Sequence, residues 1–143
     1  MAEPFTHSLR VRWAECDPQG VVFNANYLLY FDLAVTELWR EAIGPWNRLT
    51  ERGLDAVVAE AGVRYRRPLR FDEEFTVQAL VERIGTTSFT VGLTIVRDGE
   101  VCAEGILRYV MIDAASGEKT PVPGDIRAAL APWTAEAAAE PAA

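Results

Sequence analysis

The residue whose type and position could best carry chemistry is Asp17, the first residue of the segment Asp17–Pro18–Gln19–Gly20. Asp, Pro and Gly at the first, second and fourth positions are typical of a type I turn. A helix is predicted a few residues later, and the unpaired N–H groups at its start favour negative charge. A carboxylate in this place could attack a carbonyl carbon or activate water against it. Alternatively, Asp17 could accept only the hydrogen bonds of its own turn.

Two asparagines, Asn24 and Asn26, mark the start of the predicted helix. A free N–H group there could donate to a developing oxyanion, or the asparagine side chains could simply cap the helix. Tyr27 and Tyr30 belong to the apolar stripe, where tyrosines are more often core residues with bonded hydroxyls than ligands. Asp32 lies in a densely apolar stretch and could either contact a substrate or sit solvated on the helix rim.

Other chemistries find little support in the sequence. His7 is the only histidine, so a Ser–His–Asp or Cys–His arrangement would depend on it alone. Cys16 and Cys102 have no CxxC or histidine-rich partner for zinc, and no glycine-rich phosphate loop is present. A formal net charge of −7 is the wrong sign for a nucleic-acid-binding face. We therefore expect no metal, no cofactor and no nucleic-acid partner.

A cluster of four arginines occupies residues 64–70, interleaved with Tyr65. Arginines can clamp phosphate groups through paired hydrogen bonds. Alternating charge at the end of a strand is also typical of a solvated edge that deters pairing between sheets. Both interpretations stay open at this point.

The elements that must position these residues follow from hydrophobic periodicity. Residues 26–43 predict a helix that is apolar nearly all round its first half, so another element must wrap it. Alternating segments predict strands over residues 8–13, 56–67, 74–84, 88–97 and 100–112. Asp98–Gly99 is a two-residue hairpin signal, and Gly92 and Gly105 would let a strand bend or approach another backbone closely. A short helical turn is expected over residues 126–130. The fold class is therefore α+β, with a curved antiparallel sheet of about five strands around one helix.

The length of 143 residues and the hydrophobic content of 50% fit one globular domain. We expect this domain to span residues 1–134, followed by an Ala/Glu/Pro tail at 135–143 that cannot order itself. No run approaches the about 20 apolar residues of a membrane helix, and residues 1–10 lack the features of a signal peptide. We expect a cytoplasmic protein with no membrane partner.

The segment VRWAECDPQGVVFNANY at residues 11–27, followed by Phe31 and Asp32, resembles the signature of the 4-hydroxybenzoyl-CoA thioesterase-like family of hotdog-fold acyl-CoA thioesterases. The resemblance extends over roughly residues 8–112. It implies a hotdog fold, in which a curved antiparallel sheet encloses a long central helix. It also implies homodimers that join their sheets, often paired into homotetramers, with each site at the boundary between protomers.

The resemblance further implies an activity and a site. Relatives use the residue matching Asp17 as nucleophile or general base on the thioester carbonyl, and a backbone N–H matching Asn24 binds the oxygen. The products would be free acid and CoA, and we favour an aromatic acyl group such as benzoyl or 4-hydroxybenzoyl. The expected substrate-binding residues are Gly20, Phe23, Tyr27, Asp32, Thr87 and Ser88.

Several alternatives remain at this stage. The hairpin at residues 85–87 lacks the basic residues thought to meet the CoA nucleotide in the relative that names the family. It offers only N–H and hydroxyl donors, which leaves residues 64–70 or Arg108 as alternative phosphate contacts. The substrate could instead be a short or medium aliphatic acyl-CoA or an acyl-carrier-protein thioester. A protein that binds acyl-CoA without catalysis is a further alternative.

Overall fold

The protein is seen in a computed structural model that describes residues 3–135. Its five strands form one antiparallel sheet in the order β1-β3-β4-β5-β2. The strands are β1 (Phe5–Arg10), β2 (Leu54–Tyr65), β3 (Glu74–Ile84), β4 (Ser88–Arg97) and β5 (Glu100–Asp113). The helices are α1 (Asn26–Ala42), α2 (Asn47–Glu51) and α3 (Gly124–Leu130), with short 3-10 turns at Trp13–Glu15 and Ala131–Trp133. The predicted tail at 135–143 lies outside the described residues, apart from Ala135.

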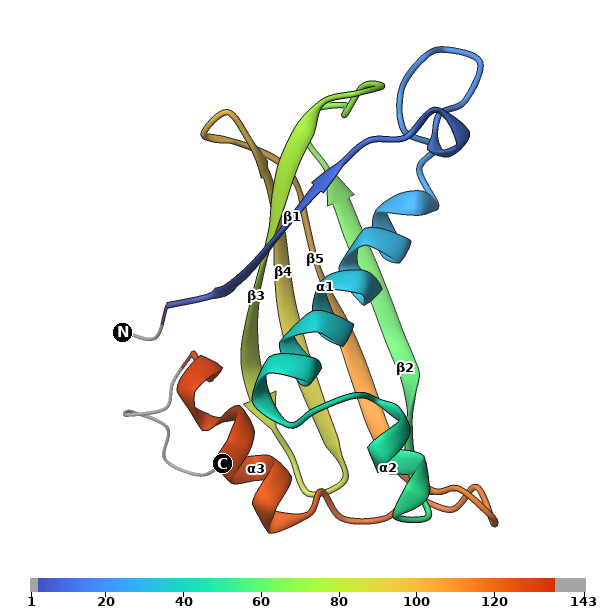
Figure 1. Ribbon diagram of the computed structural model, residues 1–143, viewed down its shortest axis with the longest axis vertical. Coiled ribbons are helices and arrows are strands. Elements are labelled where there is room, and N and C mark those ends of the chain that lie inside the picture. The colour runs from blue at the N-terminus through green and yellow to red at the C-terminus, as the bar shows by residue number, and fades with distance from the viewer. Residues whose placement is uncertain (1–2, 136–143) are drawn as a thin grey trace.

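The α+β class and the five antiparallel strands are confirmed, and α1 lies along one face of the sheet (Figure 1). The first strand was predicted at residues 8–13, but β1 runs from Phe5 to Arg10, so both of its ends lie three residues earlier than predicted. The Val11 N–H still donates to the Glu73 carbonyl, but the Arg12 N–H turns to the Glu15 carboxylate. That side-chain bond diverts the chain from the sheet into a 3-10 turn. The helical turn expected at 126–130 is the longer α3.

The hairpin predicted at Asp98–Gly99 is confirmed. Asp98 has φ +50° and Gly99 has φ +78°. Positive φ at both central residues is what a type I′ turn requires, and this turn matches the twist of the two strands it joins. The turn links the end of β4 to the beginning of β5. The beginning of β5 lies beside the loop that follows β2.

One face of α1 forms the core against the sheet. Its buried residues are Tyr27, Tyr30, Phe31, Ala34, Val35, Leu38 and Trp39. The helix ends where predicted, because Gly44 takes φ +133° and its N–H donates to the Trp39 carbonyl. The predicted enclosure is found only in part, since Leu29 on the other face is 43% exposed. No helix within residues 3–135 is long and apolar enough to cross a membrane.

A glycine in β5 allows the sheet and α1 to approach closely, as expected for Gly105. A Cβ atom at this position would lie 2.0 Å from the Gly62 carbonyl oxygen and 2.9 Å from the Phe31 ring. Neither the backbone of β2 nor the fully buried ring of Phe31 can give way easily. Packing against β2 on one side and against α1 on the other therefore excludes any side chain at position 105.

We expect Gly105→Ala to lower the free energy of unfolding by about 3 kcal/mol, because the new methyl group overpacks the core. Chemical denaturation with urea measures this difference. Gly62→Ala on the neighbouring strand is the matched control, since nothing lies within 4 Å of its added Cβ. Equal stability losses for the two variants would contradict the packing argument.

Candidate active site

The segment around Asp17 folds as predicted. The Gly20 N–H donates to the Asp17 carbonyl at 2.9 Å, and Gly20 takes φ +81°. The Gln19 N–H donates to Asp17 Oδ1 at 2.8 Å, which is the hydrogen bond of an Asx turn. Asp17 therefore does cap its own turn, but Oδ2 accepts no hydrogen bond from residues 3–135. The turn bond holds the carboxylate in place and leaves one oxygen available.

The Asp17 turn is attached to the segment between β2 and β3. Its base closes through the Asp17 N–H, which donates to the Val21 carbonyl at 2.8 Å, and through a bridge between Cys16 and Val22. Val21 also bridges Arg70, and the Val22 N–H donates to the Leu69 carbonyl at 2.8 Å. These backbone contacts place the start of α1 beside the arginine-rich residues 64–70.

Glu15 anchors this loop on α1 with its side chain. Glu15 is only 7% exposed, and its carboxylate accepts hydrogen bonds from the Arg12 N–H (2.9 Å), Arg12 Nε (2.7 Å) and the Tyr30 hydroxyl (2.7 Å). Burial acts to raise the pKa of Glu15, but the bonds from Arg12 and Tyr30 outweigh it, so the pKa is lowered. Burial and the bond to Glu15 raise the pKa of Tyr30, which keeps this hydroxyl a donor.

The backbone carbonyl of Glu15 ties the other end of the loop. It accepts hydrogen bonds from the Phe23 N–H and from Asn26 Nδ2, both at 2.9 Å. The prediction that Asn24 or Asn26 caps α1 is therefore wrong. Ala25 is the N-cap residue and no side chain caps it, because the Asn26 amide is used on Glu15.

These contacts leave the N–H of Asn24 without an acceptor among the described residues. The N–H of Ala25 likewise has no acceptor among these residues, whereas that of Asn26 donates to the Phe23 carbonyl at 2.8 Å. The Tyr65 hydroxyl donates to the Asn24 carbonyl at 2.9 Å, and this bond fixes the backbone of Asn24. A fixed, unpaired N–H beside the N-terminus of α1 is suited to an anionic oxygen.

A hollow of about 240 Å³ lies beside Asn24. Its lining residues are Val22, Asn24, Tyr27, Tyr65, Arg66, Arg67 and Pro68. Tyr27 is buried, accepts a hydrogen bond from the Leu69 N–H at 3.0 Å, and packs edge-on against Tyr65. The core interpretation of Tyr27 and Tyr30 is confirmed, although Tyr27 also forms part of this wall. Phe23 is 48% exposed and stands outside the hollow.

Asp32 lies on the open side of α1 and is exposed. Its Oδ1 accepts a hydrogen bond from the Tyr109 hydroxyl at 2.9 Å. Burial and the negative charge of Asp32 raise the pKa of Tyr109, so the buried phenol remains the donor. Tyr109 pairs with Val58 of β2, which places Asp32 toward the β2 edge of the sheet.

Thr87 and Ser88 lie at the opposite end of the sheet from Asp17 and Asn24. Ser88 pairs with Val110 near the end of β5, whereas Tyr65, which contacts Asn24, pairs with Ala103 near its beginning. Figure 1 shows the β3–β4 hairpin at one end of the sheet and the loop before α1 at the other. One protomer thus brings Asp17, Gly20, Phe23, Asn24 and Tyr27 to the same end, without Thr87 and Ser88.

Two residues that position the candidate site, Glu15 and Tyr65, were not predicted from the sequence. Glu15 was hidden because the 3-10 turn breaks the period-2 pattern that would indicate an inward side chain. Tyr65 stood inside the arginine cluster, but its reach to Asn24 depends on a contact 41 residues away in the chain. No local pattern could have indicated that contact.

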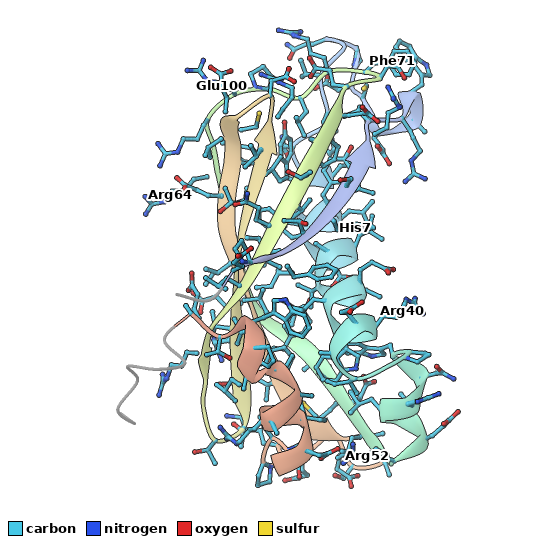
Figure 2. The ribbon with its side chains drawn as sticks, turned by 60° about the vertical axis from the view of Figure 1, so that its left-hand side comes forward. His7, Arg40, Arg52, Arg64, Phe71 and Glu100 are labelled. Carbon is cyan, nitrogen blue, oxygen red and sulfur yellow. The ribbon has the colours of Figure 1, made fainter. Side chains whose placement is uncertain are left out.

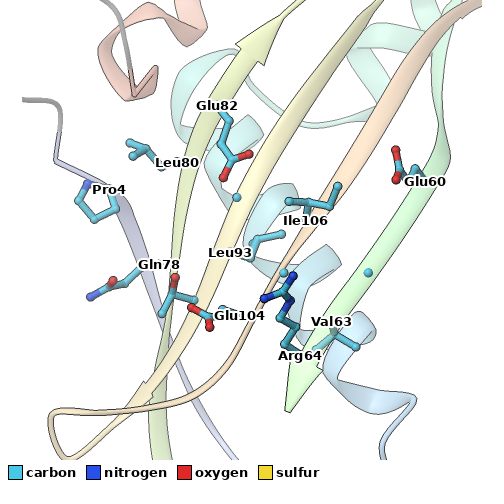
Figure 3. A pocket seen from close by; sticks show the side chains of 14 residues that line it. Pro4, Glu60, Val63, Arg64, Gln78, Leu80, Glu82, Leu93, Glu104 and Ile106 are labelled. Carbon is cyan, nitrogen blue, oxygen red and sulfur yellow. The ribbon is translucent and has the colours of Figure 1, made fainter. Parts of the chain in front are cut away.

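A larger hollow, of about 810 Å³, lies on the sheet face opposite α1 (Figure 3). Its labelled polar residues are Glu60, Arg64, Gln78, Glu82 and Glu104. None of the predicted catalytic or substrate-binding residues lines it. The candidate site is therefore the smaller hollow beside Asn24, together with the Asp17 turn.

Residues 11–130 match the Thioesterase-like superfamily, and the chain belongs to this family. It is 28% identical to the 1,4-dihydroxy-2-naphthoyl-CoA hydrolase of Nostoc punctiforme, over 85% of this chain and 83% of that protein. It is 26% identical to the acyl-CoA thioester hydrolase YbgC of Escherichia coli, over 85% of this chain and 92% of that protein. The crystal structure of a hypothetical protein from Aquifex aeolicus superposes with a TM-score of 0.85 at 28% identity, covering 89% of this chain and 99% of that one. The protein is accordingly a thioester hydrolase with a hotdog fold.

The Glu15 contacts generate a prediction about stability and pH. Because the pKa of Glu15 is lowered in the folded protein, its stabilisation is present above its usual pKa of 4.5 and is lost as pH falls through the folded value. We expect Glu15→Gln to lower the free energy of unfolding by about 2 kcal/mol at pH 7. The difference from the parent should shrink below about pH 4.5.

Urea denaturation at several pH values measures this effect. Glu37→Gln is the control, because Glu37 forms a solvent-exposed ion pair with Arg40 and should change stability by less than about 1 kcal/mol. A Glu15→Gln deficit that stayed constant from pH 7 to pH 3 would show that the charge of Glu15 is not what holds the loop.

Proposed function

We propose that this protein hydrolyses an acyl-CoA thioester to the free acid and CoA, with Asp17 as the catalytic carboxylate and the Asn24 N–H as the oxyanion donor. The observation that carries the proposal is that Glu15 holds both groups at one end of the molecule. One oxygen of Asp17 and the N–H of Asn24 are left unpaired there among the described residues. A nucleophile or base and an oxyanion donor are the two groups that thioester hydrolysis requires.

The role of Asn24 follows from where charge develops. In the transition state the thioester carbonyl oxygen becomes negative, and a preorganised N–H stabilises it without reorganising. One such donor contributes about 10²–10³ in rate. The bonds of Glu15 to Phe23 and Asn26 fix the backbone on both sides of Asn24, which supplies this preorganisation.

Asp17 could act by either of two routes. As a nucleophile, its oxygen bonds to the carbonyl carbon, the CoA thiolate leaves, and water then cleaves the mixed anhydride. As a general base, it removes a proton from water, and the resulting hydroxide displaces the thiolate. In both routes the Gln19 N–H orients the carboxylate through Oδ1, so Oδ2 is the oxygen that reacts. Neither route uses a histidine.

An aromatic acyl group is our favoured substrate. Asp32 keeps Oδ2 free of hydrogen bonds from the described residues while Tyr109 holds Oδ1, so it could accept a bond from a ring hydroxyl. The exposed ring of Phe23 and the exposed Leu29 add apolar surface near the start of α1. A relative named for a dihydroxynaphthoyl-CoA substrate supports this preference.

We propose that the protein acts as a homodimer joined along β2. This strand lies at the edge of the sheet and exposes Val57 (44%) and Val58 (47%). A long, apolar, unpaired edge strand is prone to pair with another chain. A second copy of β2 in antiparallel register would cover it and extend the sheet.

The same arrangement would complete the site. Val57, near the beginning of β2, shares a register line with Val110 and Ser88, whereas Tyr65 ends β2 beside Asn24. Antiparallel pairing sets the beginning of one β2 against the end of the other. The partner subunit's Thr87 and Ser88 would thereby approach Asp17. Pairing of two dimers into a homotetramer and a cytoplasmic location complete the proposal.

The catalytic assignment predicts a large kinetic effect. We expect Asp17→Asn to lower kcat by at least about 10³-fold, equivalent to roughly 4 kcal/mol, because the reacting carboxylate is lost. Release of CoA thiol from benzoyl-, 4-hydroxybenzoyl-, phenylacetyl-, butyryl- and palmitoyl-CoA measures activity and acyl preference together. The aryl-CoA substrates should give the highest kcat/KM.

Asp98→Asn is the matched control, because Asp98 also lies in an exposed turn and Asn tolerates its positive φ. This variant should keep kcat within about twofold of the parent. Full activity of Asp17→Asn would contradict the assignment of Asp17. Preference for butyryl- or palmitoyl-CoA would overturn the aromatic proposal while leaving the reaction class intact.

The dimer generates a separate prediction. We expect Val58→Lys to give a monomer near the chain mass of 15.8 kDa, because a charged edge strand resists pairing. Activity should be lost as well, since the partner would no longer supply Thr87 and Ser88. Size-exclusion chromatography with light scattering measures the mass. Val101→Lys, at an exposed position on β5, is the control and should remain oligomeric; a fully active monomer would refute the shared site.

A further inference from the structure

The side chain of Arg67 makes no hydrogen bond to a carboxylate among the described residues, unlike that of its neighbour Arg66. Arg66 donates to Glu104 through Nε at 2.7 Å. Arg64 lines the hollow on the sheet face opposite α1 (Figure 3). The side chain of Arg67 is 58% exposed, and its only ion contact is with Glu100, from Nε at 3.8 Å. Its guanidinium is therefore available to another anion.

Two hollows meet at this arginine. One is the 240 Å³ hollow that reaches Asn24, and the other, about 480 Å³, is lined by Tyr65, Arg66, Arg67, Glu100 and Val101. Figure 2 shows Glu100 and Phe71 at the same end of the molecule, with Arg52 at the opposite end. The backbone of Arg67 is fixed, because its N–H donates to the Cys102 carbonyl at 3.0 Å. A ligand leading away from Asn24 would pass from the first hollow to the second beside Arg67.

CoA carries its negative charge far from the thioester, on a diphosphate and a ribose phosphate beyond the uncharged pantetheine arm. The protein has a net charge of −7, so its overall field repels these groups. Binding them requires a local cation, and the arginine fork matches phosphate geometry. The hairpin at residues 85–88 contains no basic residue.

We propose that Arg67 binds the diphosphate of CoA in the 480 Å³ hollow, while the pantetheine arm occupies the 240 Å³ hollow and leads to Asn24. This inference rests on the acyl-CoA hydrolysis proposed above and names the part of the site that recognises CoA. Glu100 opposes the interaction, since its carboxylate faces both Arg67 and the incoming phosphates. Arg67 is thus a determinant of specificity for CoA over shorter thiols.

The test compares an acyl-CoA with the same acyl group on pantetheine, which lacks every phosphate. Arg67→Ala should raise KM for the acyl-CoA by about tenfold, the usual effect of losing a charge-assisted hydrogen bond, and leave kcat and the KM for acyl-pantetheine unchanged. Glu100→Gln should lower KM for the acyl-CoA by about twofold, because it removes a repelling charge. Arg10→Ala, which removes an arginine of similar exposure from the opposite edge strand β1, should change neither KM.

A binding measurement separates this inference from the proposed reaction. Calorimetric titration of the parent protein with free CoA and with pantetheine needs no turnover, so it remains decisive even if no thioester is hydrolysed. Weaker CoA binding by Arg67→Ala, with pantetheine binding unaltered, supports the phosphate contact. Equal KM values for parent and Arg67→Ala on acyl-CoA, or equal losses for both thioesters, would overturn it.

Discussion

Glu15 is only 7% exposed, and a buried carboxylate is stable in a folded protein only if hydrogen-bond donors replace the water it has lost. Glu15 meets this condition with the N–H and guanidinium of Arg12 and with the hydroxyl of Tyr30. The bonds of Glu15 bend the chain out of β1 and fasten it to Tyr30, near the start of α1. The Asp17 turn and the first residues of α1 are both positioned by this requirement, since the Glu15 carbonyl also receives the bonds of Phe23 and Asn26.

The hotdog architecture places this loop where it can act. The sheet packs against one face of α1, and Gly105 allows the close approach that brings Phe31 against the strands. The open face of α1 and the unpaired edge of β2 lie on the side where Tyr109 holds Asp32. A thioester hydrolase of this family therefore has its proposed reacting groups at one end of the sheet and exposed apolar surface along the neighbouring edge.

The electrostatic design is local. The chain carries a net charge of −7, and two arginines near the candidate site are already paired with carboxylates, Arg66 with Glu104 and Arg12 with Glu15. Composition alone would suggest a poor surface for an anionic ligand. The position of each arginine matters more than the total charge, because one guanidinium without a hydrogen-bonded carboxylate, next to a hollow, can outweigh a weak, screened overall field.

The sequence by itself determined the elements whose signals are local. The limits of β3 and β4, the Asp98–Gly99 hairpin and the turn at Asp17 all follow from periodicity and turn chemistry within a few residues. Tertiary structure decided which groups remained free. The Asn26 side chain bonds to the loop and does not cap the helix. Tyr65 bonds to Asn24, 41 residues away in the chain. Thr87 and Ser88 lie at the far end of the sheet. These outcomes depend on contacts between residues distant in the chain, and no local pattern encodes which partner a polar group will find when water is excluded.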